Sequence, residues 1–219
     1  MAIFLLLFVA PLAFSEGFYS LGIGVNFFTD IFPEDSYSRK QISTNMNMSY
    51  YYFPKDFLLG LYLRASLGGS SLYKEQNARE TMRARKSDIF EFRAVASPSL
   101  RLQLGSKFQI PFSLGPAFIF SNEKSSERIY ISGVYSSGAE NKTYSYQSIS
   151  GGINGDLAFV VIPSKRFFLR PGISFDYIFL RTEKGEMRMN YRTTHNTKYT
   201  SVPYSAFNTS IYFELGMRY

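Results

Sequence analysis

Along most of the chain, apolar and polar residues alternate one by one, which is the pattern of β-strands with two unlike faces. The C-terminal stretch 207–219, FNTSIYFELGMRY, shows this alternation clearly. One row is apolar and runs from Phe207 to Tyr219, whereas the other row is polar and contains Glu214 and Arg218. The two rows lie on opposite faces of a strand, so the stretch predicts a strand whose apolar face ends on an aromatic residue.

Seven further segments alternate in the same way, so eight strands are expected in total. The seven segments are 19–28, 41–53, 59–67, 88–102, 110–120, 146–162 and 167–179. Pro111 and Pro116 fall within the fifth segment, and proline has no N–H to donate to a β-ladder. A bulge or a local break in pairing is therefore expected there.

The connections between these segments alternate between short and long. Short turns are expected at 54–56, 105–107 and 163–165, and long polar segments at 29–40, 68–86, 121–143 and 181–203. The segment 68–86 is interpreted as a loop, because its helical spacing is poor. In 121–143, residues such as Tyr130 and Val134 indicate that the hairpin continues beyond the membrane. Short turns at one end and long loops at the other are typical of bacterial outer-membrane barrels.

The composition agrees with an all-β protein. Tyr and Phe occur 17 and 22 times, whereas Trp and Cys are absent, and aromatic residues favour strands. Without cysteine there is no disulfide framework and no thiolate metal site. No apolar run after residue 15 is long enough for a membrane helix. The net charge of +7 is spread over several segments, which favours contact with anionic lipid head groups over a nucleic-acid partner.

The first fifteen residues, MAIFLLLFVAPLAFS, are predicted to be a signal peptide. The apolar run is too short to span a bilayer, and Ala13 to Ser15 offers small residues for cleavage. The mature barrel domain would then comprise residues 16–219. No Lys or Arg precedes the apolar run, and the alternative is a buried helix or strand at the start of a cytosolic domain.

Charge placement indicates which face of each strand points inward. The polar rows contain five arginines and four acids, a near balance that permits pairing inside a narrow lumen. These predicted lumenal residues are Arg64, Glu91, Arg93, Arg101, Asp156, Arg170, Asp176, Glu214 and Arg218. The apolar rows would then form a lipid-facing belt, with aromatic girdles that include Tyr19 and Tyr50 near the turns and Tyr177 and Phe207 near the loops. The alternative is a soluble lipocalin-like barrel with the apolar rows inside.

These features predict an all-β, eight-stranded, antiparallel up-and-down transmembrane β-barrel. The chain resembles the small bacterial outer-membrane barrels typified by OmpX, the OmpA transmembrane domain and OmpW. Its C-terminal assembly signal would consist of Phe213, Leu215, Met217 and Tyr219, although Gly216 stands later than the glycine that is common in this signal. The resemblance implies an outer-membrane location, contact with membrane lipids and with the barrel-assembly machinery, and a monomer.

Little in the sequence points to catalysis or to a cofactor. His195 is the only histidine, and no spacing singles out a nucleophile or an orienting acid for it. The most pointed loop feature is a basic patch at Arg79, Arg83, Arg85 and Lys86, which is either solvated or in contact with lipid phosphates or an anionic host polymer. We therefore expect a non-enzymatic barrel with a side-chain-filled lumen and four surface loops for interaction or adhesion. The alternative is an OmpW-like narrow channel for small, mainly hydrophobic solutes.

Overall fold

The computed structural model describes residues 15–30, 40–54, 58–78, 81–131, 140–189 and 192–218, and every regular element in them is a strand. The prediction of an all-β antiparallel barrel is confirmed. The strands are β1 (Ser15–Asp30), β2 (Lys40–Pro54), β3 (Leu59–Ala78), β4 (Thr81–Leu104), β5 (Phe108–Ile131), β6 (Glu140–Ala158), β7 (Val160–Val161), β8 (Phe167–Met189) and β9 (Arg192–Arg218).

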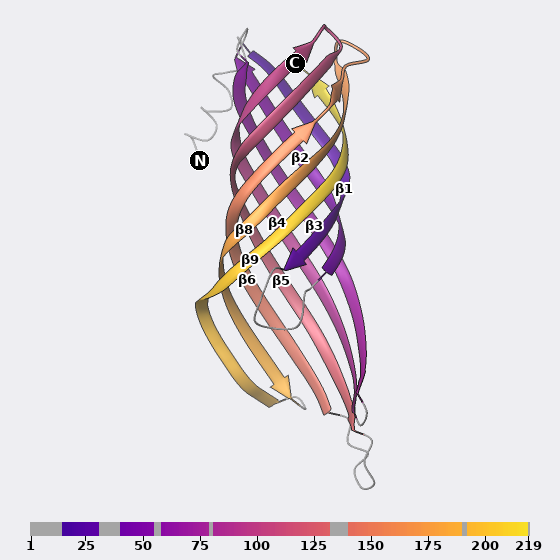
Figure 1. Ribbon diagram of the computed structural model, residues 1–219, viewed down its shortest axis with the longest axis vertical. Coiled ribbons are helices and arrows are strands. Elements are labelled where there is room, and N and C mark those ends of the chain that lie inside the picture. The colour runs from indigo at the N-terminus through magenta and orange to yellow at the C-terminus, as the bar shows by residue number, and fades with distance from the viewer. Residues whose placement is uncertain are drawn as a thin grey trace.

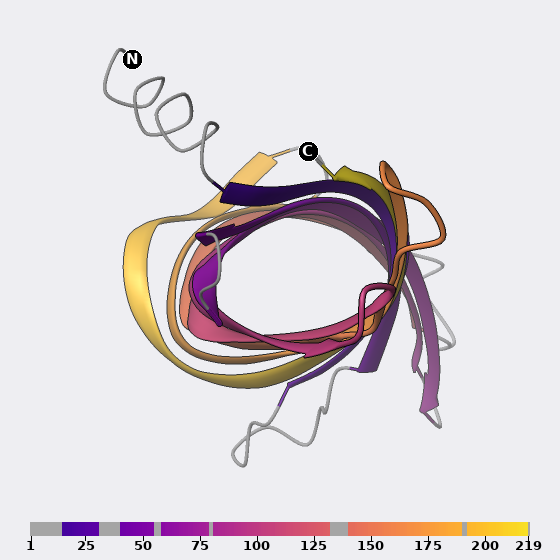
Figure 2. The same ribbon diagram turned by 90° about the horizontal axis from the view of Figure 1, so that it is seen from above.

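The strands form one closed ring (Figure 2). Each long strand pairs antiparallel with the long strands before and after it in sequence, and β1 also pairs with β9, which closes the sheet. The short β7 continues β6 after a break at Phe159, because Val160 and Val161 pair with the same neighbours, β5 and β8. The ring therefore has eight strands, and closure leaves the membrane-spanning sheet without an edge.

Two of the three predicted short connections lie where the sequence predicts them. Gly105 begins the turn 105–107 with a φ of +77°, a left-handed conformation that glycine adopts without a steric penalty. The second short connection covers residues 163–166. Residues 55 and 56 of the third predicted turn lie outside the described residues. The first residues of β1 and the last of β9 lie at this same end, which we call the turn end (top of Figure 1).

At the opposite, loop end the strands are longer than predicted. The interpretation of 68–86 as a loop is wrong, because β3 continues to Ala78 and β4 begins at Thr81. Likewise, most of 181–203 belongs to β8 and β9. Continuation of the 121–143 hairpin is confirmed. Beyond the belt a ladder needs only backbone hydrogen bonds, so a polar segment can extend it without an apolar row.

The loop end is also asymmetric. β2 and β3 pair only as far as Thr44 and Gly69, whereas β3 remains paired with β4 up to Ala78. The hairpin of β1 and β2 stops short, and the long strands β3, β4, β5, β6, β8 and β9 extend past it (Figure 1).

The expected irregularity in β5 is a break in pairing. Between β4 and β5, Val95 pairs with Ala117 and Ser99 with Ser113, and the three positions between them on each strand do not pair across this ladder, although the register does not change. A true bulge lies elsewhere, in β8. There Gly152 pairs with Ile178 and Gly151 with Leu180, so Phe179 is an extra residue in the strand.

The apolar rows face outward, as the charge placement indicates. Ile23 and Met46 on the barrel wall are 69% and 70% exposed, whereas the alternating residues on the other face are buried. The soluble lipocalin-like alternative is wrong, because its apolar rows would be inside. Aromatic contacts mark both rims of the belt: Tyr19 stacks on Tyr50 at the turn end with ring centroids 4.6 Å apart, and Tyr177 lies 5.0 Å from Phe207 toward the loops.

The N-terminal segment up to residue 14 lies outside the described residues, so the signal peptide stays a prediction. Within the described residues, no helix has the length and apolar character needed to cross a membrane.

Candidate functional site

The interior of the barrel holds the charged side chains of the polar rows. All nine predicted lumenal residues lie on interior-facing positions of their strands. Seven of them are buried, and Glu91 and Arg218 are half-buried. Because isolated charges in such an interior would be costly, the question is how each one is paired.

Arg170 on β8 is the centre of the network. It is completely buried, and its guanidinium donates to two carboxylates: Nη1 lies 2.5 Å from Glu214 Oε2, and Nη2 lies 2.6 Å from Asp156 Oδ1. Nη2 also lies 2.6 Å from the Tyr212 hydroxyl and donates to the Tyr51 hydroxyl. The guanidinium carbon sits 4.5 Å from the centre of the Tyr51 ring and 4.8 Å from that of Tyr212, which adds cation–π attraction.

The two carboxylates are surrounded by further donors. Asp156 accepts from the hydroxyls of Tyr212 at 2.8 Å and Tyr51 at 3.0 Å, and it lies 3.4 Å from Arg64 Nη1. Glu214 accepts from the hydroxyls of Ser20 at 2.5 Å and Ser49 at 2.9 Å. These bonds satisfy much of the acceptor capacity that burial would otherwise leave unpaired.

A second ion pair lies nearer the loop end. Arg93 Nη1 is 2.6 Å from Asp176 Oδ2, and Arg93 Nη2 is 2.7 Å from Glu91 Oε1. Asp176 also accepts from the side-chain amides of Asn154 at 2.6 Å and Asn208 at 2.8 Å. The strands β4, β6, β8 and β9 are thus tied together across the interior.

Apolar side chains fill the lumen at the turn end. They form one buried cluster, whose members include Phe18, Phe53, Val160, Ile162 and Phe168. Phe18 and Phe168 meet edge to face with centroids 5.4 Å apart. The other two predicted arginines cap this cluster, since Arg101 lies 4.5 Å from the Phe53 ring and Arg218 lies 5.9 Å from that of Phe18.

A second, smaller apolar layer lies on the loop side of the ion pairs. It consists of Ile119, Ile178 and Ala206, with Phe28 packed against them. Beside it is a cavity of about 40 Å³ that is also lined by Glu91 and Arg181. Charged and apolar layers therefore alternate along the interior.

The aromatic members of this interior were not predicted as site residues. Tyr62 and Tyr212 stand on the polar rows of the sequence, and Tyr51 sits between two outward tyrosines. These positions within the alternation are the only sequence signal that the three side chains point inward. The Tyr212 ring packs closely against the backbone of β8. A β-carbon at Gly172 would lie 2.3 Å from the Tyr212 hydroxyl, so only glycine fits beside that ring.

The other predicted sites lie outside the interior. Phe213, Leu215 and Met217 of the C-terminal signal are exposed on the outer wall, and Tyr219 lies outside the described residues. Of the basic patch, Arg83, Arg85 and Lys86 lie on β4, but only the Lys86 side chain is described, 3.9 Å from Asp88. Arg79 and the His195 side chain lie outside the described part. Among the described residues, no group of three or more histidines and acids could hold a metal ion.

This chain is similar to known proteins in structure but not in sequence. No protein-family model and no curated protein matches the sequence. The outer-membrane protein OprG from Pseudomonas aeruginosa has the same fold with a TM-score of 0.51 at 13% identity, covering 94% of this chain and 96% of that chain. The attachment invasion locus protein Ail of Yersinia pestis matches with a TM-score of 0.48 at 10% sequence identity, covering 94% of this chain and 99% of that chain. Neisserial surface protein A matches with a TM-score of 0.41 at 11% sequence identity, covering 90% of this chain and 95% of that chain.

At these identities the likeness concerns the fold, and the exposed belt is the surface that this fold needs in a lipid bilayer. The chain is therefore similar to the small outer-membrane proteins in architecture, and it is an eight-stranded antiparallel β-barrel with an apolar outer belt.

Proposed function

We propose that the protein is a sealed, non-enzymatic barrel that presents its outer hairpins at the cell surface for interaction with other molecules. The observation that carries this proposal is the filled interior. From the turn end, a path along the axis meets the Phe53 and Phe168 layer, the network around Arg170, the Arg93–Asp176 pair, and then the Ile119 layer. Eight strands leave an interior just wide enough for side chains, so such a filling is what closure predicts.

This filling argues against the channel alternative. A solute on the axis would have to displace buried ion pairs, and removing one partner of such a pair leaves an uncompensated charge. An OmpW-like route would therefore have to avoid the layer around Arg170, which is 0% exposed.

The outer hairpins are the part of the barrel to which we assign binding of a partner, because the membrane strands serve as the scaffold. The long strands β3, β4, β5, β6, β8 and β9 continue well past the belt as a polar, paired sheet (Figure 1), so the loops are carried by a paired scaffold. Binding residues are commonly placed on loops held in this way. The basic residues of the hairpin between β3 and β4 favour an anionic partner, such as an acidic host glycan, over nucleic acid. We expect the barrel to act as a monomer that contacts membrane lipids and, during assembly, the barrel-assembly machinery.

Planar-bilayer recording tests the seal. Purified monomer should show no steady conductance, because buried side chains occupy the layer around Arg170. A large, steady conductance, or uptake of small apolar solutes that disappears when the gene is deleted, would replace this proposal with the channel alternative.

Binding by intact cells tests the hairpins. Replacing Arg79, Arg83 and Arg85 with glutamine should weaken binding of a sulfated polysaccharide. The matched control replaces Lys107, Lys165 and Arg166 with glutamine, which removes the same charge from the turn end. If the two triple variants bind equally while both barrels assemble, the basic patch is solvated and the proposed partner class is wrong.

A further inference from the structure

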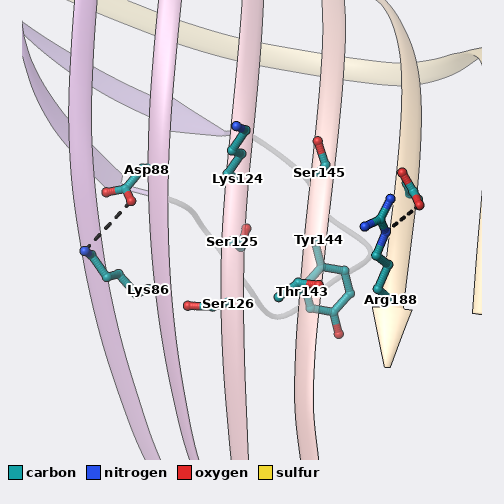
Figure 3. A pocket seen from close by; sticks show the side chains of 10 residues that line it. Lys86, Asp88, Lys124, Ser125, Ser126, Thr143, Tyr144, Ser145 and Arg188 are labelled. Atoms are coloured by element: carbon teal, nitrogen blue, oxygen red, sulfur yellow. Dashed lines mark hydrogen bonds and ion pairs between the residues drawn. The ribbon is translucent and has the colours of Figure 1, made fainter. Parts of the chain in front are cut away.

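Three adjoining hollows follow the outer wall from the belt toward the loop end. The first is an apolar groove of about 770 Å³ that spans β1 to β4 and the neighbouring parts of β8 and β9. The second, of about 640 Å³, lies on β3, β4 and β5, and the third, of about 500 Å³, spans β4, β5, β6 and β8 (Figure 3). Gly69 and Phe90 line both the first and the second, and Asp88 and Lys124 line both the second and the third. The hollows therefore form one continuous track.

At the apolar groove, a glycine on the outward row of β3 interrupts the belt. Gly68 and Gly69 follow Leu67 on β3, and Gly69 lies on the outward row. The nearest atom to a β-carbon at Gly69 would be the Ile89 carbonyl oxygen at 3.5 Å, an ordinary contact distance. The space outside Gly69 is thus open to the bilayer, with Met46 and Phe90 among its apolar walls.

Lys124 stands at the polar part of the track. It lies on the outward row of β5, four residues beyond Phe120 of the belt. At a rise of about 3.3 Å per residue and a tilt near 40°, it lies roughly 10 Å beyond Phe120 along the barrel axis. That is the level at which lipid head groups meet the edge of an apolar belt.

The charges around Lys124 leave its amine available. Asp88 accepts from the Ser71 hydroxyl at 2.5 Å. Asp88 also lies 3.9 Å from Lys86, and Glu186 accepts from Arg188 at 2.7 Å (Figure 3). Among the residues that the structure describes, none forms a hydrogen bond or ion pair with the amine of Lys124. Lys86, Lys124 and Arg188 also outnumber Asp88 and Glu186 around the third hollow, so its net charge favours an anion.

We propose that this track is a binding site for one anionic lipid of the outer leaflet, with an acyl chain in the apolar groove and the head-group phosphate at Lys124. Each end fits its part of such a lipid: the groove is open to the hydrocarbon, and the cation stands at head-group level. The site goes beyond the proposed surface interaction, because it needs neither the outer hairpin loops nor the residues 79–85.

The absence of tryptophan makes a direct test possible. Phe90→Trp gives a single fluorescent reporter beside the groove. The protein is placed in phosphatidylcholine vesicles that contain a minor fraction of brominated phosphatidylglycerol or, separately, brominated phosphatidylcholine, and quenching is measured. We expect the brominated anionic lipid to be preferred about fivefold at this reporter, the effect of one lysine near an anionic surface. Phe175→Trp on the belt face of β8 should report no preference.

Two substitutions assign the preference to the track. Lys124→Gln should remove it, whereas Lys107→Gln at the turn end should not. Gly69→Leu should fill the groove and lower quenching by both lipids. Its control is Gly155→Leu, because Gly155 is also outward with its nearest atom 3.8 Å from a β-carbon, but lies outside the groove.

Three results would overturn the site. They are equal quenching by the two lipids at Phe90→Trp, a preference that survives Lys124→Gln, or displacement of both lipids by a small apolar solute irrespective of Lys124. The last result would assign the groove to a solute. None of these results depends on whether the hairpins bind a surface partner, so the two proposals fail separately.

Discussion

Removing Arg170 should destabilise the barrel more than any other change to a single interior charge. Arg170→Met keeps much of the side-chain volume but leaves Asp156 and Glu214 without the cation that lies 2.6 and 2.5 Å from them. The balance of the central network, two arginines against two acids, changes to one arginine, Arg64, against two acids. A buried carboxylate without its counter-ion is costly, because the charge has lost its hydration on folding and no cation compensates for it.

The size of the loss follows from what remains. Breaking a buried ion pair by removing one partner costs about 3–5 kcal/mol. Here Asp156 keeps donors from Tyr51 and Tyr212, and Glu214 keeps those from Ser20 and Ser49, so we expect the lower end, about 3 kcal/mol. Adding Glu214→Gln to Arg170→Met restores the charge balance and should recover part of the loss.

The free energy of unfolding is measured by urea titration in phospholipid vesicles, followed by far-UV circular dichroism and by gel mobility without heating. Arg166→Met, at an exposed turn position four residues away, is the control and should change stability by less than about 0.5 kcal/mol. If Arg170→Met costs under about 1 kcal/mol, or if adding Glu214→Gln makes it worse, the network is not held by the charge pairing described.

Three further changes probe the belt and the interior in the same unfolding assay. Ile211→Arg puts a charge on the lipid-facing wall and should cost about 2–4 kcal/mol if the position lies near the bilayer midplane; a neutral effect would argue against lipid there. Gly172→Ala should destabilise the barrel by pushing the Tyr212 ring away, and an unchanged midpoint would mean that the ring moves freely. Tyr212→Phe removes a hydroxyl that donates to Asp156 and should cost about 1–2 kcal/mol; no loss would show that Asp156 is satisfied without it.

Alternation along the sequence was enough to predict the strands and the face that each one exposes. This works because the side-chain period of a strand is two, so a single charged residue such as Arg64 or Asp156 assigns its whole row to the interior. The strand ends at the loop side were harder to predict. In 68–86 the ladder is held by backbone hydrogen bonds between β3 and β4, and these leave no hydrophobic signature.

The interior partners could not be predicted from the sequence. Tyr50, Tyr51 and Tyr52 are identical in type, and only the pairing of Tyr51 with Phe18 and Tyr62 in the final register places it inside. The pairing of Arg170 with both Asp156 and Glu214 depends on strand tilt and on contacts across the lumen, which a list of residues does not contain. The sequence also does not distinguish an outward tyrosine from an inward one by residue type, because both faces of this barrel carry aromatic side chains.

The extra residue Phe179 acts as a phase shift in β8. Phe179 and Leu180, although consecutive, are both outward and exposed. The even-numbered residues point inward up to Ile178, whereas Arg181, Glu183 and Gly185 do so after the extra residue. A single insertion thus exchanges the two surfaces of the outer half of this strand and leaves the membrane half untouched. Gain or loss of one residue here would turn Arg181 and Glu183 from the interior to the outside in one step. Through such a change, a barrel of this kind could present a different surface to its surroundings while its membrane anchor stays the same.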